Sequence, residues 1–200
     1  ANSFVASEEM EVLTVPGTHT RRPDIVGFVN GIPLLIIEAK RPDSGNPNKS
    51  MVDEGISQTI RNQGQEEIPH LFAYAHLLLS IGMTDGRYGT TKTPRKFWAQ
   101  WREEEFSEDH FSQIKNAAKE IDPRAAILKN HVREVRDHFQ HLWSDEQAVT
   151  AQDRLLIGLC TPERLLEFVR SYVLFDRKLD KIVARHQQFF GIHALLDQIN

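Results

Sequence analysis

The sequence has one cysteine among its 200 residues, Cys160. A single thiol can form neither an internal disulfide nor a thiolate metal cluster. Long apolar runs are also missing, because the longest, from Ile32 to Ile37, is too short to span a membrane and contains a proline. No charged segment followed by an apolar one stands at the N-terminus, as it does in secretory signals. We therefore expect a chain of the reducing cytoplasm, without a membrane partner.

A surplus of positive charge is absent as well. The 24 lysines and arginines face 28 acidic residues, for a net charge of −4. Proteins that hold DNA by bulk electrostatics usually carry a basic surplus. Any contact with DNA is therefore expected to be local, or other parts of a larger assembly hold the DNA. The chain begins at Ala1 rather than at a methionine and ends inside an apolar helical pattern, so we expect it to be a fragment.

The organisation of the chain changes near residue 105. Hydrophobic residues make up 40% of the sequence, enough for one substantial core or for a compact domain plus part of another. We expect an α/β domain over residues 1–105, with a mixed central sheet flanked by helices, and a helical segment over 106–200. Expected strands lie near residues 4–5, 12–15, 25–29, 32–37, 76–82, 87–90 and 97–101. Expected helices lie near residues 51–63, 109–120, 124–143, 151–160 and 162–175.

The strongest local signal is the turn at Asn30-Gly31, which predicts a hairpin. Both arms are apolar on both faces, which is typical of strands inside a sheet that is covered on both sides. Two charged residues end the second arm, Glu38 and Lys40, and their spacing places both side chains on the same face. Asp24 stands at the mouth of the first arm. Charged groups at the end of a buried run are costly unless they are paired or bind a cation.

These residue types fit phosphodiester hydrolysis. Two carboxylates on neighbouring strands offer the hard oxygen ligands that Mg²⁺ prefers. A lysine beside them could orient a water molecule and stabilise negative charge on a phosphate. The chemistry requires Asp24 to lie opposite Glu38, whereas a strict two-residue turn would pair Asp24 with Ile37 and put the carboxylates on opposite faces. We expect a three-residue turn, with Gly31 left-handed and a bulge, to supply the offset.

The residues Pro23-Asp24, followed after the hairpin by Glu38-Ala39-Lys40, resemble the PD-(D/E)xK signature of nucleases. The residues around this motif are more specific to one family than the motif itself. Over about the first half of the chain they resemble the nuclease domain of the R (restriction and motor) subunit of type I restriction enzymes. The segments that carry this resemblance are Arg22–Val26, Phe28–Leu34, Ile37–Lys40, Gln58, Ile68–Phe72 and Arg87–Thr90.

The resemblance implies a restriction-endonuclease-like fold and a set of site residues. Asp24 and Glu38 would be magnesium ligands together with the backbone carbonyl of Ala39, and Lys40 would be the catalytic lysine. Gln58 would face the site from the next helix.

The sequence departs from the family pattern at two places. Many relatives carry a tyrosine four residues after that glutamine, where this chain has Asn62. The acidic residue that relatives place on an earlier helix lies upstream of Ala1, or is replaced by Glu8, Glu9 or Glu11.

The C-terminal part also resembles the R subunit. Residues 181–189 are similar to the segment that leads into its ATP-driven motor, where Gln188 would read the adenine. No GxxxxGK[ST] phosphate loop is present, so the chain alone is not expected to hydrolyse ATP. The resemblance thus implies Mg²⁺-dependent endonucleolytic cleavage of double-stranded DNA in a bacterial or archaeal cytoplasm. The partners would be the methyltransferase and specificity subunits of a type I complex, and ATP would be a cofactor of the full-length parent.

Two other functions stay open. The chain could belong to another PD-(D/E)xK enzyme, such as a repair or mobile-element nuclease. It could also be a non-catalytic docking domain in which the charged trio is only a buried ion-pair network. His138 and His141 lie one helical turn apart, but without a third ligand in view a solvated helix face is the simpler interpretation. The remaining notable side chains, Trp98, Trp101 and Cys160, are predicted to pack in the core.

Overall fold

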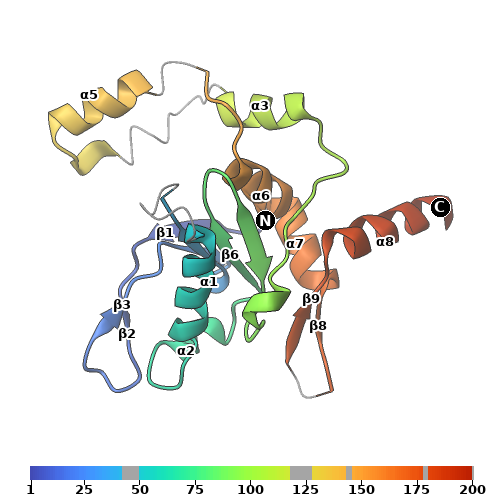
Figure 1. Ribbon diagram of the computed structural model, residues 1–200, viewed down its shortest axis with the longest axis horizontal. Helices are drawn as coiled ribbons and strands as arrows, with labels where there is room; N and C mark the ends of the chain where they lie inside the picture. Colours follow the sequence, from blue (N-terminus) through green and yellow to red (C-terminus); the bar gives the residue numbers. More distant parts are fainter. Residues whose placement is uncertain (42–49, 118–127, 143–145, 178–179, 200) are drawn as a thin grey trace.

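The computed structural model describes residues 1–41, 50–117, 128–142, 146–177 and 180–199. At its centre is a five-stranded sheet with the order β1-β4-β5-β6-β7 (Figure 1). Strands β5 and β6 run parallel and the other neighbouring pairs are antiparallel, which confirms the predicted mixed sheet. The bounds of the strands are β1 (Phe4–Glu8), β4 (Ile25–Val29), β5 (Ile32–Ala39), β6 (Leu77–Ile81) and β7 (Gly86–Gly89).

Helices surround this sheet, and two short ribbons extend from it (Figure 1). The helices of the described residues are α1 (Met51–Asn62), α2 (Pro69–Phe72), α3 (Glu108–Asn116), α5 (Arg133–Leu142), α6 (Ala151–Cys160), α7 (Pro162–Ser171) and α8 (His186–Ile199). The ribbons are β2 (Val12–Leu13) with β3 (Thr20–Arg21), and β8 (Val173–Phe175) with β9 (Lys181–Val183). Two 3-10 turns complete the description, η1 (Arg95–Phe97) and η2 (Leu128–Asn130).

The hairpin between β4 and β5 has the required offset, but the offset does not arise in the turn. Asn30 and Gly31 both have positive φ, 52° and 81°, and Val29 pairs directly with Ile32. The turn is therefore a strict two-residue turn with the left-handed residues that suit a hairpin, and the predicted three-residue turn is wrong. The register shifts further along, between Gly27 and Phe28, where Leu34 is the extra residue on β5.

This bulge pairs Ile25 with Ile37. In the same antiparallel register, the next two residues toward the open end, Asp24 and Glu38, therefore lie opposite each other. Leu34 and Leu35 both pack against the same hydrophobic core, and the Leu34 carbonyl accepts a hydrogen bond from the backbone N–H of His76 at 2.9 Å. The extra residue is thus packed on one side and hydrogen-bonded at its carbonyl. The core, rather than the turn, determines which face Asp24 occupies.

Gly27 makes room for the bulge, and enlarging it is expected to destabilise the hairpin. A Cβ atom at this position would lie 3.1 Å from Leu35 Cβ and 3.2 Å from Leu35 Cδ2. We expect Gly27→Val to lower the free energy of unfolding by about 2 kcal/mol, as overpacking of a core does. The matched control is Ala6→Val, on the exposed residue that pairs with Gly27 in β1, and it should change stability little. Urea denaturation measures both, and equal effects would contradict the crowding at Gly27.

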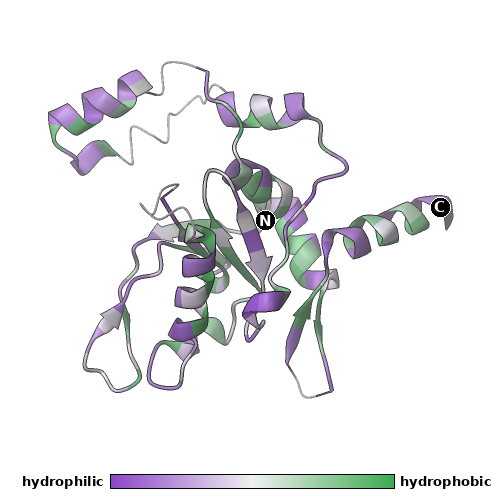
Figure 2. Ribbon diagram, in the orientation of Figure 1, coloured by the Kyte–Doolittle hydropathy of each residue, from purple (hydrophilic) through white to green (hydrophobic). Residues whose placement is uncertain are grey.

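Each face of the sheet carries its own hydrophobic core. On one face, α1 and α2 pack Ile56 and Phe72 against Val26, Ile36 and Leu78. On the other, helices α6, α7 and α8 cover the opposite side chains of β5, β6 and β7. Figure 2 shows the hydrophobic colour on the central strands, whereas α5, away from the sheet, is largely hydrophilic. The prediction of a sheet covered on both sides is confirmed.

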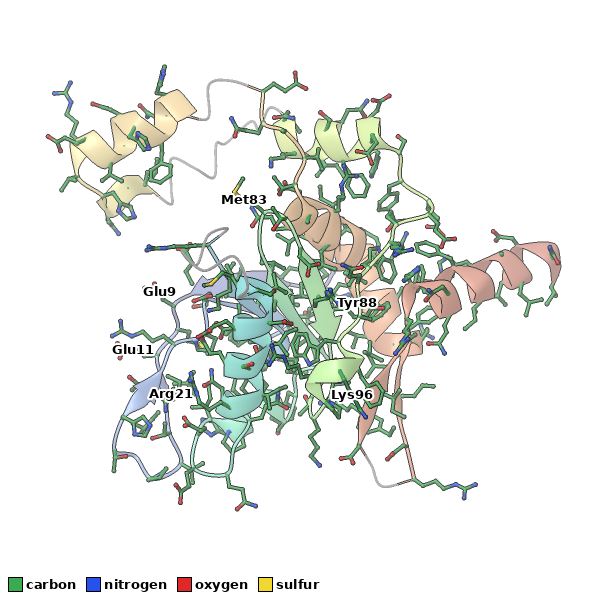
Figure 3. All side chains as sticks on the ribbon, viewed as in Figure 1. Glu9, Glu11, Arg21, Met83, Tyr88 and Lys96 are labelled. Carbon is green, nitrogen blue, oxygen red and sulfur yellow. The ribbon has the colours of Figure 1, made fainter. Side chains whose placement is uncertain are left out.

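The second core depends on residues from the helical half of the chain. Leu159, Phe168 and Phe189 are completely buried there, and Tyr88 of β7 lies among them, with its hydroxyl donating to the Ala184 carbonyl at 2.9 Å (Figure 3). The predicted core positions of Trp98 and Trp101 are confirmed, and Cys160 is partly buried against the same cluster. The division of the chain at residues 105 and 106 stays a prediction about domains.

Some expected elements differ from the structure. Residues 97–101 do not form a strand: η1 follows Pro94, and only an isolated bridge joins Ala99 to Tyr88. The alternation there reflects two tryptophans that pack separately. The helix expected over 162–175 ends at Ser171, because the β-branched and aromatic residues of β8 pair with β9 instead.

Parts of three other predictions fall outside the described residues. They are most of the loop at 41–50 and the portions of the helices at 109–120 and 124–143 that lie within 118–127 and 143–145. The helix predicted over 51–63 is α1, and Ser50 caps it by accepting a hydrogen bond from the Asp53 N–H at 3.3 Å. Across the described ranges, no helix combines the length and apolar character needed to cross a membrane.

Candidate active site

Three charged residues meet at the open end of the β4–β5 hairpin. Asp24 directly precedes β4, Glu38 is the second-to-last residue of β5, and Lys40 follows that strand. The side chain of Asp24 accepts a hydrogen bond from the Ala39 N–H at 2.7 Å, which ties the start of one arm to the end of the other. The register produced by the bulge makes this contact possible. The predicted convergence of Asp24, Glu38 and Lys40 is present in the structure.

Lys40 Nζ lies at the centre of the group. It is 3.2 Å from Glu38 Oε2 and 3.8 Å from Asp24 Oδ2, and it donates to Gln58 Oε1 at 3.0 Å. Gln58 in turn donates from Nε2 to Glu38 Oε2 at 2.7 Å. Gln58 comes from α1, so the prediction that it faces this site from the next helix agrees with its position. Four side chains from three elements thus form one connected polar cluster.

The two carboxylates have different environments. The Glu38 side chain is 1% exposed and that of Asp24 is 35% exposed. Burial, together with the nearby negative charge of Asp24, raises the pKa of Glu38 to about 7, against the opposing effect of the Lys40 ammonium. One lysine therefore does not fully offset the cost of holding a buried carboxylate beside a second one.

The structure adds one neighbour that sequence reasoning missed. Ser80 pairs with Glu38 in the parallel register of β5 and β6, is completely buried, and donates to the Val52 carbonyl of α1 at 2.7 Å. The available signal was a single hydroxyl within an otherwise apolar strand. Gly55, on the same face of α1 as Gln58, lies against both Ser80 and Lys40.

The remaining predicted residues have the following positions. Ala39 is exposed at the end of β5, beside the carboxylates. Asn62 is 2% exposed on the sheet side of α1, and its Oδ1 has no hydrogen-bond partner among the described residues.

The candidate replacements for the earlier acidic residue lie elsewhere. Glu8 ends β1, the Glu9 N–H donates to the Asp24 carbonyl at 3.0 Å, and Glu11 forms an ion pair with Arg22. Figure 3 shows Glu9 and Glu11 at the edge of the molecule. Within the described ranges, none of the three carboxylates contacts the polar cluster.

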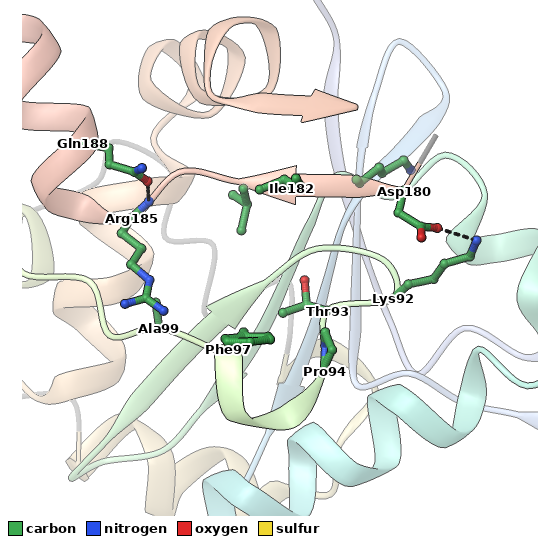
Figure 4. Close-up of a pocket in the computed structure, with 11 residues that line it drawn as sticks. Lys92, Thr93, Pro94, Phe97, Ala99, Asp180, Ile182, Arg185 and Gln188 are labelled. Carbon is green, nitrogen blue, oxygen red and sulfur yellow. Dashed lines mark hydrogen bonds and ion pairs between the residues drawn. The ribbon is translucent and has the colours of Figure 1, made fainter. Parts of the chain in front are cut away.

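Gln188 lies in a different place, near the start of α8. Its side chain accepts a hydrogen bond from the Arg185 N–H at 2.8 Å. It helps to line a pocket of about 680 Å³ between the η1 region and β9, together with Phe97, Ile182 and Arg185 (Figure 4). This pocket shares no lining residue with the polar cluster. The adenine-reading role of Gln188 stays a prediction.

The donor set can be compared with what a metal requires. In the part of the chain that is described, no group of three His, Cys, Asp or Glu side chains is arranged to hold a metal ion, and this includes His138 and His141. The polar cluster offers two carboxylates, both directed at a single cation, Lys40 Nζ. Mg²⁺ is commonly bound by one or two carboxylates and several waters, so two such oxygens with a backbone carbonyl are a suitable set.

Comparisons with known proteins cover the part of the chain that contains this cluster. Residues 1–97 match the family described as "Type I restriction enzyme R protein N terminus". A putative type I restriction enzyme MjaIXP endonuclease subunit of Methanocaldococcus jannaschii is 26% identical over 198 residues, which are 98% of this chain and 16% of that protein. The type I restriction enzyme HindI endonuclease subunit of Haemophilus influenzae is 26% identical over 200 residues, 98% of this chain and 15% of that protein.

The chain spans only these small shares of the curated relatives it matches, although nearly all of it is covered. The family match includes every member of the polar cluster, Asp24, Glu38, Lys40 and Gln58. Over residues 1–97, the chain is therefore similar to the N-terminal family of type I restriction enzyme R proteins.

Proposed function

We propose that this chain is the nuclease part of a type I restriction enzyme R subunit, and that it cleaves double-stranded DNA endonucleolytically with Mg²⁺. The observation that carries the proposal is the polar cluster, in which Asp24, Glu38, Lys40 and Gln58 converge from β4, β5 and α1. The names of the relatives, which are endonuclease subunits, support the same reaction.

Asp24 and Glu38 would hold the metal ion, with the carbonyl of Ala39 as a further ligand. A bound Mg²⁺ polarises a phosphoryl oxygen and lowers the pKa of a water molecule. The half-exposed Asp24 lies on the solvent side of the site and the buried Glu38 on the protein side. This difference in exposure leaves one side of the site open to a DNA backbone.

Lys40 and Gln58 act on the phosphate and on each other. Lys40 supplies a positive charge where negative charge accumulates on the phosphate during hydrolysis. Its amine is held by Glu38 and Gln58 at 3.2 Å and 3.0 Å, and its side chain is only 13% exposed. Gln58 contacts both partners of this ion pair, and so fixes the direction in which the amine points.

The wider assembly is part of the same proposal. A chain with a net charge of −4 has no basic surplus for holding DNA, so the DNA would be delivered by other parts of the enzyme. Those parts are a specificity subunit, a methyltransferase subunit and an ATP-driven motor. Gln188 would contact the adenine of the ATP that the motor uses. The competing function is a docking module in which the cluster is a structural ion-pair network.

Calorimetric titration with Mg²⁺ or Mn²⁺ tests the proposal. We expect binding by the unchanged chain, and a loss of at least about tenfold in affinity in Asp24→Asn and Glu38→Gln, because each variant removes an anionic oxygen ligand. Asp180→Asn is the matched control, because Asp180 is a partly exposed carboxylate that also pairs with a lysine, Lys92, but does not belong to the polar cluster. No binding by the unchanged chain, together with full DNA cleavage by Lys40→Ala in the assembled enzyme, would support the docking module instead.

A further inference from the structure

Helix α1 lies unusually close to the sheet at Gly55. A Cβ atom on this residue would collide with Ser80 Oγ, and would lie 3.2 Å and 3.3 Å from Lys40 Cε and Cγ. Glycine in a helix interior is destabilising relative to alanine, so its presence here calls for a packing reason. Gly55 lies three residues before Gln58, which places both on the same face of the helix, above β5 and β6.

Ser80 is the other half of this contact. It is completely buried, and its hydroxyl donates to the Val52 carbonyl in the first turn of α1. The hydroxyl could rotate away from a new Cβ atom only by giving up that bond. Ser80 also pairs directly with Glu38 across the two parallel strands. The residue that anchors α1 is therefore the immediate neighbour of the carboxylate that Gln58 must reach.

We propose that Gly55 and Ser80 are positioning residues of the nuclease site, which seat α1 at the height that brings Gln58 into contact with Lys40 and Glu38. The consequence for cleavage rests on the proposed function, whereas the seating of Gln58 does not. The Gln58 bonds are 3.0 Å and 2.7 Å long, and a hydrogen bond is lost when its partners separate beyond about 3.5 Å. A lift of the helix by the size of one methyl group therefore breaks both.

The first measurement is the side-chain amide signal of Gln58 in the ¹⁵N-labelled chain without metal. Gln58→Ala identifies the signal by its disappearance. We expect Gly55→Ala to shift it, Ser80→Ala to shift it less, and Gly55→Ala/Ser80→Ala to return it toward the Ser80→Ala position, because the double variant lacks the oxygen that the new Cβ atom meets. An unchanged signal in Gly55→Ala would overturn the proposal. If that variant does not fold, an unchanged signal in Ser80→Ala has the same meaning.

Two glycine variants separate positioning from general damage. Gly191→Ala makes the same change in α8, where a Cβ atom would meet nothing within 4 Å, and it should leave the signal in place. Gly158→Ala forces a Cβ atom to within 2.5 Å of Trp101 Nε1 and should lower thermal stability. It should nevertheless leave the Gln58 signal in place, because Gly158 packs on the other face of the sheet.

Cleavage by the assembled enzyme is the second measurement. Gly55→Ala should reduce it by about 100-fold, as small misplacements of positioning groups do, and the double variant should recover most of that loss. Gly158→Ala should cleave at the unchanged rate below its melting temperature, whereas a merely structural defect would lower cleavage in both glycine variants. If Asp24→Ala cleaves normally, the proposed function fails, and the seating of Gln58 is still decided by the amide signal. If Asp24→Ala is inactive while Gly55→Ala is fully active, the positioning role fails alone.

Discussion

In the assembled enzyme, Asp24→Ala, Glu38→Ala and Lys40→Ala are each expected to lower DNA cleavage by about 100-fold or more, while ATP hydrolysis is retained. The two carboxylate variants remove the anionic oxygens that would hold Mg²⁺. Lys40→Ala removes the amine that lies within 4 Å of both carboxylates and touches Gln58, so it also leaves the buried Glu38 without its cation. Retention of ATP hydrolysis is expected because none of the three residues lines the pocket that contains Gln188.

Lys115→Ala is the matched control for the lysine variant. Lys115 also forms an ion pair with a carboxylate, that of Asp153, and its side chain is 19% exposed, but it belongs neither to the polar cluster nor to the pocket that contains Gln188. The Lys115→Ala enzyme should cleave DNA at the rate of the unchanged enzyme. Cleavage on supercoiled DNA and ATP hydrolysis are measured on the same preparations. Simultaneous loss of both activities in the three cluster variants would indicate that the cluster holds the fold together, and full cleavage by all three would exclude it as a nuclease site.

The second large effect concerns stability. A chain that ends at residue 105 should fail to fold cooperatively, although it contains the whole five-stranded sheet. Without α6, α7 and α8, one face of the sheet loses its cover, including the completely buried side chains of Leu159, Phe168 and Phe189. Burial of one such side chain contributes about 1.5–3 kcal/mol, and domains are stable by only about 5–15 kcal/mol in total. The loss of three of them, with their neighbours, is comparable to the entire stability.

Circular dichroism during urea denaturation measures this effect. The control is a chain that lacks only residues 194–200, where Leu195 and Leu196 are 56% and 49% exposed, so their removal uncovers little. That chain should unfold in one transition near the midpoint of the full chain. If the chain of residues 1–105 also unfolds in a single steep transition at a similar midpoint, the helices of the second half are not needed for the core, and the domain boundary predicted at 105 is correct as a folding boundary.

The candidate site was accessible to sequence reasoning because its signals are local. The Asn30-Gly31 turn favours a hairpin by backbone conformation alone, and the two-residue period of a strand puts Glu38 and Lys40 on one face. The requirement that Asp24 oppose Glu38 followed from chemistry, and the observed register agrees with it. The origin of the offset could not be derived in the same way. A longer turn and a bulge within the strands would both pair Asp24 with Glu38 at the open end of the hairpin.

The acidic stretch after residue 102 shows the opposite situation. A run of acidic residues is typical of a solvated linker. The Glu103 side chain, however, is 4% exposed and accepts a hydrogen bond from Trp101 Nε1 at 2.8 Å. Arg164 of α7, itself 8% exposed, pairs with both Glu103 and Glu105. Arg164 lies about sixty positions away in the sequence, so it does not affect the hydrophobic pattern near the two glutamates. The local sequence therefore does not indicate that this segment is held against the core.

The sequence by itself determined the hairpin, the shared face of Glu38 and Lys40, and the start of α1 at its serine cap, because turn preference, strand period and capping act between residues a few positions apart. Tertiary structure alone decided where the bulge lies, how closely α1 approaches Ser80, and that helices from the second half complete the core over the sheet. Those outcomes depend on how side chains distant in sequence fill a shared volume, and close packing is a property of the whole fold rather than of any segment.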